Sequence, residues 1–550
     1  MNSQMSAFAT TIMQQKYAHT VDENKETWEE IAKRVATNVM KSVGVPKAMV
    51  REIEKMIAER KFMPGGRYLY ASGRPFHQVQ NCLLMRAEDS REGWADLLQK
   101  SGMALMTGAG IGVVYSDVRA KGKPIRKTGG IATGPIALMQ MVNECGRGIQ
   151  QGGSRRSAIW AGLHWNHPDC LEFIQIKNWI PEVRALKEKD YNFPATLDGT
   201  NVSVILDDDF FKAYKDEKHS QHALAHTIYW ATVRQMRKTA EPGFSIDCGP
   251  NKGENLRNAC TEVTSFDDSD ICNLGSINMA RIGSLEEMER VTELATAFLL
   301  AGTVYSDVPY AKVDLIRTKN RRLGLGLMGL HEWLLKNGKK YGPDPELEEY
   351  LKIYAKSTEI SWKYADEWEL SRPKKTRAIA PTGTIGIVAE TTTGIEPIFC
   401  VAYKRRYLKG NVVHYQYVID PTAQNLIDSG VSPEAIEDAY VLAEDVERRV
   451  AFQAWVQKYV DHAISSTINI PSWGSEQNND SGVREFGEML MKYLPDLRGV
   501  TCYPDGARGG QPLTPVRYST AVRHIGVEMS EVVVEQADVC DITKGGSCGA

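Results

Sequence analysis

Strand patterns and helix patterns alternate through the middle of this chain, and this alternation limits its possible folds more than any other feature. Residues 201–206 are typical of a buried strand, residues 210–214 begin a helical pattern, and residues 244–247 are typical of a further strand. Helical patterns then cover residues 285–305 and 347–370. Strands that alternate with helices form layered α/β folds, so we expect an α/β protein.

The composition is that of an ordinary globular protein. The 550 residues are 42% hydrophobic and 25% charged, and the formal net charge of −3 argues against a nucleic-acid binder. The N-terminus lacks the basic and apolar regions of a signal peptide. The most apolar run, residues 294–305, is too short to cross a bilayer. We therefore expect a cytoplasmic protein with neither a nucleic-acid nor a membrane partner.

Ten cysteines are too few for a disulfide scaffold, which makes catalytic, redox or metal-binding cysteines the better interpretation. The chain contains no Cys-x-x-Cys pair, which argues against a zinc ribbon. His164, His167 and Cys170 have the spacing of metal ligands, but a structural zinc takes four ligands. We therefore expect no metal site.

The stretch Asn258-x-Cys260-x-Glu262 combines a thiol with a possible base. In an extended segment, residues i, i+2 and i+4 point to one side, so these three side chains would project together. Ala259 and Thr261 would then turn away. A carboxylate with the ordinary pKa of about 4.3 is ionised at neutral pH, so Glu262 could accept a proton beside Cys260. The alternative is a buried cysteine that packs as a small hydrophobic residue.

Glycine-rich and basic segments offer places for phosphate groups. Residues 107–112 are rich in glycine, and residues 151–157 form a second loop that is both glycine-rich and basic. Glycine lets a ligand approach the backbone, and arginine offers forked donors to phosphate. At residues 377–386, an apolar strand would enter a Thr/Gly turn suited to phosphate, without the Walker A ending. Either basic turn could equally be an ordinary exposed loop.

Gly324, Gly326 and Gly329 match the Gly-x-Gly-x-x-Gly pattern of a dinucleotide-binding turn. Such a turn follows an apolar strand and is followed by a second strand that ends in an acidic residue. Here two arginines precede the glycines, and residues 339–345 do not have a strand pattern. An NAD-linked dehydrogenase is therefore an alternative that nicotinamide binding would test.

Five features, in their order along the chain, resemble the catalytic subunit of ribonucleotide reductase from about residue 60 to the C-terminus. They are Asn81-Cys82; the loops at residues 108–112 and 151–156; the stretch 258–262 with Cys272-Asn273-Leu274-Gly275; residues 381–386 with Gly394-Ile395-Glu396-Pro397; and a terminal cysteine pair. Each feature is weak alone, but the ordered set is very specific.

The resemblance implies a ten-stranded α/β barrel of two parallel five-stranded halves, with a central finger loop that carries Cys260. We expect a small N-terminal helical cap at residues 1–65, the barrel with its effector loops at 66–520, and a flexible redox tail at 521–550. A cap of this size leaves no room for the family's ATP-binding cone, so we expect no overall inhibition by dATP through such a domain.

The resemblance also implies catalytic roles. Cys260 would be a transient thiyl radical that takes the 3′ hydrogen of the ribose, Glu262 would be the base for the 3′ hydroxyl, and Asn258 would hold the ribose hydroxyls. Cys82 and Cys272 would protonate the departing 2′ hydroxyl and supply two electrons, ending as a disulfide.

Cys540 and Cys548 in the tail would reduce that disulfide by thiol exchange, and a thioredoxin-like or glutaredoxin-like protein would reduce the tail pair in turn. The tail pair of the family is usually closer together in the sequence.

Further matches concern nucleotides. The residues that would bind the ribonucleotide substrate, with its phosphates in the 381–386 turn, are Asn81, Ala109, Gly110, Pro381, Thr382, Gly383, Thr384 and Ile385. The residues that would bind a deoxynucleoside triphosphate or ATP as allosteric effector are Asp89, Arg119, Arg126 and Arg155. The helices that flank the effector loops would form a homodimer.

Three radical sources occur among the relatives considered. The glycyl-radical class is disfavoured, because the sequence has no terminal glycyl-radical motif with a zinc cysteine cluster. Oxygen-dependent members use two adjacent tyrosines and a separate metal-containing small subunit, whereas here Tyr503 is followed by Pro504, which has no redox-active ring. The twelve residues from Cys260 to Cys272 and the run 503–508 look more like the class that uses adenosylcobalamin and needs no second subunit. We therefore expect adenosylcobalamin as cofactor. The alternatives are an oxygen-dependent large subunit with Tyr503 on its radical path, and a non-catalytic nucleotide-binding regulator.

Overall fold

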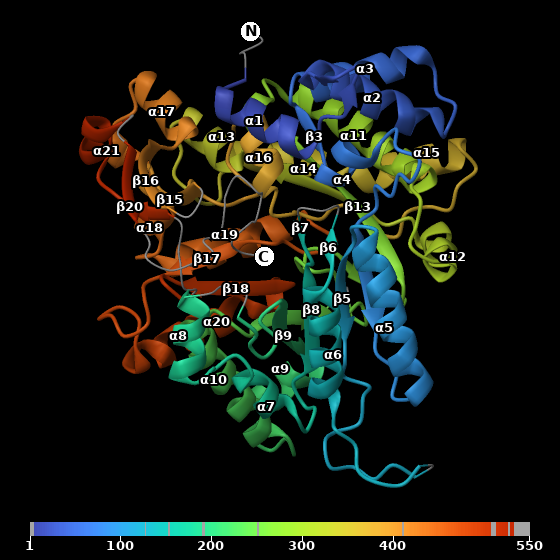
Figure 1. Ribbon diagram of the computed structural model, residues 1–550, viewed down its shortest axis with the longest axis vertical. Coiled ribbons are helices and arrows are strands. Elements are labelled where there is room, and N and C mark those ends of the chain that lie inside the picture. Colours follow the sequence, from blue (N-terminus) through green and yellow to red (C-terminus); the bar gives the residue numbers. More distant parts are fainter. Residues whose placement is uncertain are drawn as a thin grey trace.

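A ten-stranded, mostly parallel sheet forms the centre of the computed structural model (Figure 1). The structure describes residues 5–126, 128–151, 155–189, 193–249, 252–409, 412–507, 513–525 and 528–532. The strand order is β14 (Leu323–Met328), β13 (Asp270–Asn278), β4 (Cys82–Arg86), β5 (Gly110–Val114), β8 (Ile159–His164), β9 (Thr200–Asp207), β10 (Gly243–Asp247), β18 (Gly499–Pro504) and β17 (Thr467–Ile470), with β3 (Phe62–Pro64) paired to β13.

The strands of this sheet run in two directions. β4, β5, β8, β9 and β10 are parallel to one another. β13 and β18 pair antiparallel with the two outer members of this group, β4 and β10, and each has its own parallel neighbour, β14 or β17. The segment at residues 377–379 makes two isolated parallel bridges, one from Arg377 to Leu325 of β14 and one from Ile379 to Ile464, shortly before β17. These single bridges stand in place of a continuous ladder between the two outer strands. The α/β prediction is confirmed in this form.

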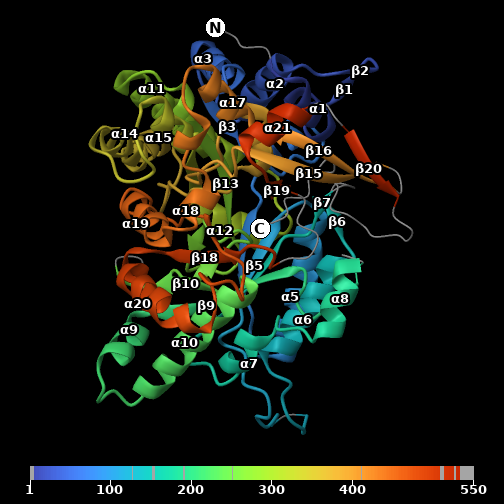
Figure 2. The same cartoon turned by 90° about the vertical axis from the view of Figure 1, so that its left-hand side faces the viewer.

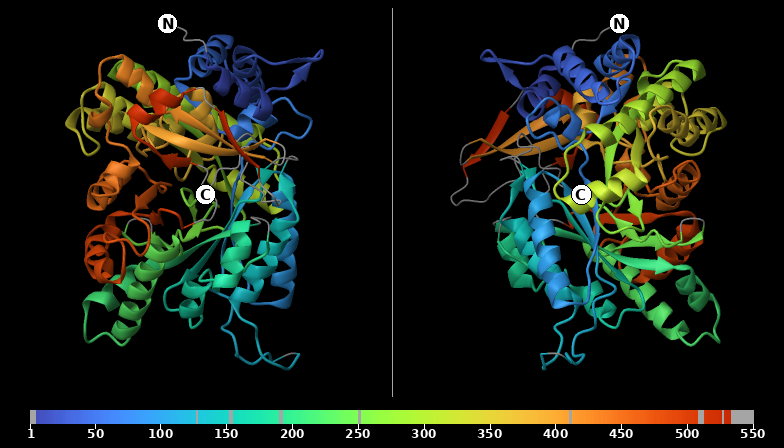
Figure 3. Two further views of the ribbon diagram at one scale, coloured as in Figure 1. Left: turned by 60° about the vertical axis from the view of Figure 1, so that its left-hand side comes forward. Right: turned by 90° about the vertical axis from the view of Figure 1, so that its right-hand side faces the viewer.

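Both faces of the sheet are covered, which explains why β10 and β14 are buried along their whole length. One apolar core lies under α2 (Trp28–Lys41), α3 (Lys47–Ala58) and α11 (Leu285–Tyr305). A second lies under α5 (Arg91–Met106), α6 (Pro135–Arg147) and α10 (His222–Thr239), toward the opposite end of the molecule (Figure 3). Leu83 and Met85 of β4 join this second core, whereas Cys82 and Leu84 point to the other face and into a third, smaller cluster.

A separate four-stranded antiparallel sheet has the order β19 (Leu513–Pro515), β15 (Ala402–Lys409), β16 (Val412–Ile419) and β20 (Glu528–Val532). α21 (Tyr518–His524) packs on β15 and β16 (Figure 2). Three two-stranded sheets complete the strands: β1 (Thr20–Val21) with β2 (Asn24–Lys25), β6 (Gln150–Gln151) with β7 (Arg155–Arg156), and β11 (Leu256–Arg257) with β12 (Thr264–Ser265). Cys540 and Cys548 lie outside the described residues.

The remaining α-helices are α1 (Ala7–Lys16), α4 (Gly66–Ala71), α7 (Cys170–Gln175), α8 (Pro181–Lys189), α9 (Asp208–Lys215), α12 (Ala311–Asn320), α13 (Leu330–Lys336), α14 (Pro345–Ala355), α15 (Ser357–Glu367), α16 (Gly383–Ala389), α17 (Pro421–Asp428), α18 (Ala439–Leu442), α19 (Val446–Gln457) and α20 (Val483–Tyr493). The pattern at 285–305 is confirmed as α11, and the pattern at 347–370 contains two helices, α14 and α15. Within the described part of the chain, no helix has the length and apolar character needed to span a membrane.

Candidate active site

A cavity of about 310 Å³ lies between the sheet and the finger loop, which we define as residues 258–263 between β11 and β12. Its lining includes these residues that the sequence suggested: Asn81, Cys82, Gly110, Asn258, Cys260, Glu262, Pro381, Thr382, Gly383, Thr384, Ile385 and Tyr503. Cys272 and Ala109 are fully buried and do not line the cavity.

The finger loop is a tight reversal and not the extended segment that the sequence suggested. The Thr261 N–H donates to the Asn258 carbonyl over 3.1 Å, and Thr261 has a positive φ of 70°. The antiparallel pairing of β11 with β12 requires this reversal. Ala259 and Thr261 consequently line the cavity together with Cys260, so the expectation that they turn away is wrong.

Glycines of β5 let the finger loop lie directly on the sheet. A Cβ atom on Gly112 would lie 1.9 Å from the Arg257 carbonyl oxygen, and one on Gly110 would lie 3.1 Å from the Ala259 Cβ. No side chain fits at Gly112 without displacement of the loop backbone. The glycine-rich run therefore serves close packing inside the protein at Gly112, while Gly110 also borders the cavity.

Cys82 and Cys272 are direct cross-strand partners in the antiparallel pairing of β4 with β13. Directly opposite residues in such a pair have Cα atoms about 4.5–5.5 Å apart, which lies within the range that a disulfide spans. Both thiols are free and buried. Burial raises the pKa of each thiol well above its ordinary value, helped at Cys82 by the charge of Glu262 and at Cys272 by that of Asp270. Both groups are therefore protonated at neutral pH and can donate a proton.

Glu262 faces Cys82 across the cavity. The Cys82 Sγ lies 4.0 Å from the Glu262 Oε1, within hydrogen-bonding range for sulfur. The other carboxylate oxygen, Oε2, is buried without a hydrogen-bond partner among the described residues. Complete burial raises the pKa of Glu262 to about 7, against the opposing effect of hydrogen bonding that includes Asn258. A carboxyl group with such a pKa can accept and return a proton near neutral pH.

Residues 381–385 form another wall of the cavity, and they comprise the entry to α16 and its first turn. Thr382 adopts a left-handed conformation, and its hydroxyl accepts a hydrogen bond from the Gly394 N–H over 2.9 Å. The N–H groups of a first helical turn have no acceptor inside the helix, so they suit an anionic group. The segment at residues 377–379, which was predicted to be an apolar strand that enters this turn, makes only isolated bridges.

Three of the predicted effector residues, Asp89, Arg119 and Arg126, do not line this cavity. Arg119 forms an ion pair of 2.8 Å with Asp89 and also donates to the Pro124 carbonyl. Arg126 is exposed, and Arg155 belongs to β7. Among the described side chains, Asp89, Arg119 and Arg126 are absent from the cavity lining, which is compatible with a second nucleotide site.

Sequence patterns did not identify every polar residue of the cavity. Arg67 lines it and donates to the Thr107 carbonyl over 3.0 Å, and the half-buried Glu396 accepts from the Thr467 N–H. Tyr17, near the end of α1, also lines it. The only sequence signal near Arg67 is the pair of glycines before it. Glu396 lies in the motif Gly394-Ile395-Glu396-Pro397, to which the sequence assigned no separate role for the glutamate.

The glycines at residues 324–329 do not form a dinucleotide turn. Gly324 and Gly326 lie inside β14, and a Cβ on either would approach a carbonyl oxygen of a neighbouring segment to 2.7 Å. They allow close packing of β14, which argues against the dehydrogenase interpretation. Among the described residues, no group of three or more His, Cys, Asp or Glu side chains could hold a metal ion.

Comparison with known protein families gives two matches that together cover most of the chain. Residues 3–77 match the family model described as "Ribonucleotide reductase, all-alpha domain". Residues 80–238, 225–368 and 371–496 match "Ribonucleotide reductase, barrel domain".

Individual relatives agree with these matches. The chain is 27% identical to a vitamin B12-dependent ribonucleoside-diphosphate reductase of Thermoplasma acidophilum, over 84% of this chain and 66% of the relative. It is 25% identical to a protein of the same name from Mycobacterium tuberculosis, over 93% of this chain and 81% of the relative. A ribonucleoside-diphosphate reductase large subunit of Plasmodium falciparum is 24% identical over 61% of this chain and 47% of the relative. The similarity to the two B12-dependent proteins therefore extends over more of the chain.

Proposed function

The chain belongs to the ribonucleotide reductase large-subunit family, and from this membership we propose that it reduces ribonucleotides to 2′-deoxyribonucleotides with adenosylcobalamin as cofactor. The observation that carries the proposal is the direct pairing of Cys82 with Cys272 beside Glu262 and the finger loop. Cys82, Cys260 and Glu262 line one cavity, and the buried Cys272 is the direct cross-strand partner of Cys82. Together they provide the groups that this reduction needs.

In the proposed reaction, Cys260 as a thiyl radical takes the 3′ hydrogen, Glu262 accepts the 3′ hydroxyl proton, and Asn258 holds the ribose hydroxyls. The protonated Cys82 then gives its proton to the 2′ hydroxyl, which leaves as water. Cys82 and Cys272 together lose two electrons and two protons and form one disulfide. The two electrons and the second proton form the new 2′ C–H bond, and Glu262 returns its proton to the 3′ oxygen. Cys260 finally returns the hydrogen atom to the 3′ carbon.

The cavity wall next to the finger loop carries small side chains, which leaves its backbone accessible to a flat ligand. Val202, Ser203, Gly243, Gly499 and Thr501 line it with small side chains, and a Cβ on Gly499 would lie 3.8 Å from the Thr261 hydroxyl, adjacent to Cys260. These residues would border the bound cofactor. Adenosylcobalamin would supply a one-electron oxidant there by homolysis of its cobalt–carbon bond.

We extend the proposal to nucleotide binding, the barrel, the domain divisions, the redox tail and the localisation. The 381–385 turn with Asn81 and Gly110 binds the substrate, and Asp89, Arg119, Arg126 and Arg155 bind the effector nucleotide. In the closed ten-stranded barrel that we propose, the segment at residues 377–379, which makes isolated bridges, would be the fifth member of the second half. We keep the proposed divisions at residues 65 and 520, although α21 crosses the second division and β20 of the proposed tail pairs with β16. Cys540 and Cys548 pass electrons from a thioredoxin-like or glutaredoxin-like protein, and the enzyme is cytoplasmic.

The test is an assay of the purified protein with adenosylcobalamin, an effector nucleotide, a dithiol reductant and either ribonucleoside di- or triphosphates. We expect deoxynucleotide product without a second protein. Cys260→Ser should abolish product and retain effector binding, whereas retained activity would contradict the radical role. Product that forms only with a metal-containing small subunit would instead favour the oxygen-dependent class, for which Tyr503 in the cavity wall is the supporting observation.

A single turnover without reductant, in a chain that carries Cys540→Ser and Cys548→Ser and so cannot pass the oxidation on to the proposed tail pair, tests the cysteine pair itself. We expect mass spectrometry to find a disulfide between Cys82 and Cys272 in stoichiometric yield, because β4 and β13 hold them opposite each other. Cys272→Ser should prevent both the disulfide and the product. Cys145→Ser, on α6 outside the cavity, is the matched control and should behave as the wild type. Product without this disulfide would show that the electrons come from elsewhere.

A further inference from the structure

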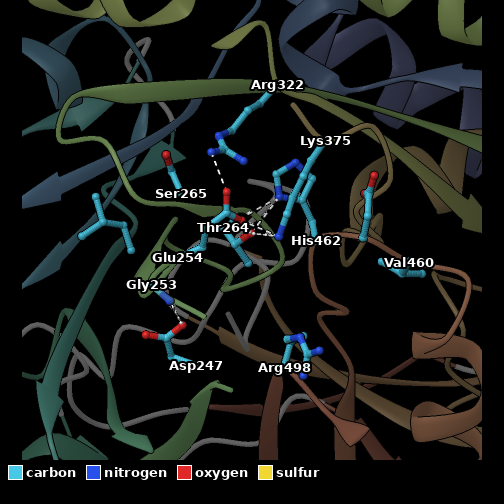
Figure 4. A network of polar contacts seen from close by, with 12 residues as sticks. Asp247, Gly253, Glu254, Thr264, Ser265, Arg322, Lys375, Val460, His462 and Arg498 are labelled. Carbon is cyan, nitrogen blue, oxygen red and sulfur yellow. Dashed lines mark hydrogen bonds and ion pairs between the residues drawn. The ribbon is translucent and has the colours of Figure 1, made fainter. Parts of the chain in front are cut away.

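A buried charged network holds the base of the finger loop (Figure 4). Glu254, just before β11, accepts a hydrogen bond of 2.9 Å from the Thr264 hydroxyl at the start of β12. The Lys375 ammonium forms an ion pair with Glu254 and donates to the same Thr264 hydroxyl over 3.0 Å. Lys375 is 7% exposed. One cation therefore joins the two arms of the loop that carries Cys260 and Glu262.

Arg322 connects this pair of arms to the strand of Cys272. Its guanidinium donates to Glu254 over 2.8 Å and to Asp270, the first residue of β13, over 2.7 Å. Asp270 also accepts from the Ser265 hydroxyl over 2.6 Å. The network contains two carboxylates and two cations, so its charges balance. Loss of one charge would leave a buried partner uncompensated, which is costly.

The segment after α19 completes the surroundings of Lys375. The Thr264 N–H donates to the His462 Nδ1 over 3.0 Å, so this imidazole is neutral, and burial with nearby cations holds its pKa well below the ordinary value. The Ala463 N–H donates to the Glu262 carbonyl over 2.8 Å. The charged groups that act on Lys375 are Glu254, Arg322 and Asp461. Burial lowers the pKa of Lys375 to about 8, partly offset by Glu254.

We propose that Lys375 is a positioning residue, whose ammonium group holds the two arms of the finger loop together through Glu254 and Thr264 and so keeps Cys260 and Glu262 in the cavity. Deprotonation leaves Glu254 with Arg322 as its remaining cation and removes the positive charge that spans the arms. The loop is then less tightly held, and both catalytic groups lose their alignment. Lys375 does not line the cavity, so it acts through the loop and not on the substrate.

Hydrogen exchange tests the positioning without reference to activity. Backbone amides of residues 258–265 in the full chain are followed between pH 7 and pH 9.5, with rates corrected for intrinsic exchange. We expect wild-type protection to fall about tenfold as the pH passes through about 8, and Lys375→Met to lack this protection at every pH. Lys375→Arg, which stays charged, should keep it to higher pH. Wild-type protection in Lys375→Met would overturn the proposal.

Lys374→Met is the matched control, because the neighbouring Lys374 lies half exposed near Asp267 and outside the network. It should leave both the exchange and its pH dependence unchanged. An equal loss of protection in this variant would show a general effect of lysine removal and would also overturn the proposal.

The kinetic test rests on the proposed reductase function, whereas the exchange test does not, so the two can fail separately. In Lys375→Met we expect kcat to fall about 10²-fold at pH 7, as for a small misplacement of reacting groups, with effector affinity unchanged. Lys375→Arg should restore most of kcat and move the alkaline decline of wild-type activity to higher pH. An alkaline decline at the same pH in wild type and Lys375→Arg would contradict the role of Lys375. If the protein reduces no ribonucleotide, the exchange result alone decides.

Discussion

Glu262 shows how far the fold can change the chemistry of a single residue. The Asn-x-Cys-x-Glu spacing indicated a base beside a thiol, and the structure places both at one cavity. The sequence could not indicate the protonation state, because the burial that raises the pKa of Glu262 to about 7 comes from distant segments. One of these carries Cys82, 180 residues away along the chain. The same burial leaves one carboxylate oxygen ready for a substrate hydroxyl.

We predict that Glu262→Gln lowers turnover by about 10²–10⁴-fold while stabilising the fold at alkaline pH. The pKa of Glu262 in the folded protein lies above its ordinary value of 4.5, so ionisation of this group destabilises the fold. The protonated group contributes its full stability below pH 4.5, and this contribution is lost as the pH rises through about 7. Removing the charge should therefore raise the melting temperature relative to wild type at pH 8 and not at pH 4.5. The difference in unfolding free energy would reach about 3 kcal/mol.

Thermal unfolding at the two pH values measures this effect. Glu289→Gln, on the exposed face of α11, is the control and should show no such pH dependence. A Glu262→Gln variant that is destabilised equally at both pH values would show that the carboxyl group is not a buried acid.

At the scale of elements, periodicity identified the strands at 201–206 and 244–247 and the helix at 285–305, but it missed how the finger loop meets β5. The helical pattern at 285–305 became α11, and the pattern at 201–206 became β9. The finger loop was taken as extended because its hairpin depends on contact with β5, which no local pattern contains. The glycines of β5 were interpreted as a ligand approach, and at Gly112 the group that approaches is the Arg257 carbonyl of the protein itself.

We predict that Gly112→Ala displaces the finger loop, because the new Cβ would lie 1.9 Å from that carbonyl oxygen. Overpacking of this kind costs about 1–3 kcal/mol, and a displaced Cys260 should lower turnover by about 10²-fold. Denaturant unfolding and the reductase assay measure the two effects. Gly342→Ala is the control, since a Cβ there meets no atom within 4 Å. Equal stability and activity in the two variants would contradict the close approach of loop and strand.

At the scale of the whole molecule, the order of motifs predicted which residues form the site, whereas the contacts that hold the site together were beyond sequence patterns. Lys375 and Thr264 are 111 residues apart and share no motif. The pairing of Cys82 with Cys272 was implied only by family resemblance, and β4 and β13 now supply its physical basis. Long-range pairing of this kind depends on the sheet order, which no single segment encodes.

The outer face of α5 and α6 supports the predicted homodimer. These two helices lie side by side (Figure 1) and expose the large apolar side chains of Met103, Met106 and Met141. Apolar side chains gathered on adjacent helices are typical of a protein interface, and a two-fold interface buries the same patch on both subunits. Both helices flank the segments that carry Asp89, Arg119 and Arg126. A dimer formed through this face would therefore bring the proposed effector site close to the interface.

We predict that Met106→Glu converts the dimer to a monomer, because two buried carboxylates would face an apolar partner surface across the two-fold axis. Met106 is 69% exposed in the single chain, so the substitution should not disturb its fold. Light scattering should give twice the chain mass of 61.3 kDa for the wild type and the single mass for the variant. Leu315→Glu on α12, where the side chain is 70% exposed, is the control and should stay dimeric. A monomeric wild type, or a Met106→Glu variant that remains dimeric, would place the interface elsewhere and separate effector binding from assembly.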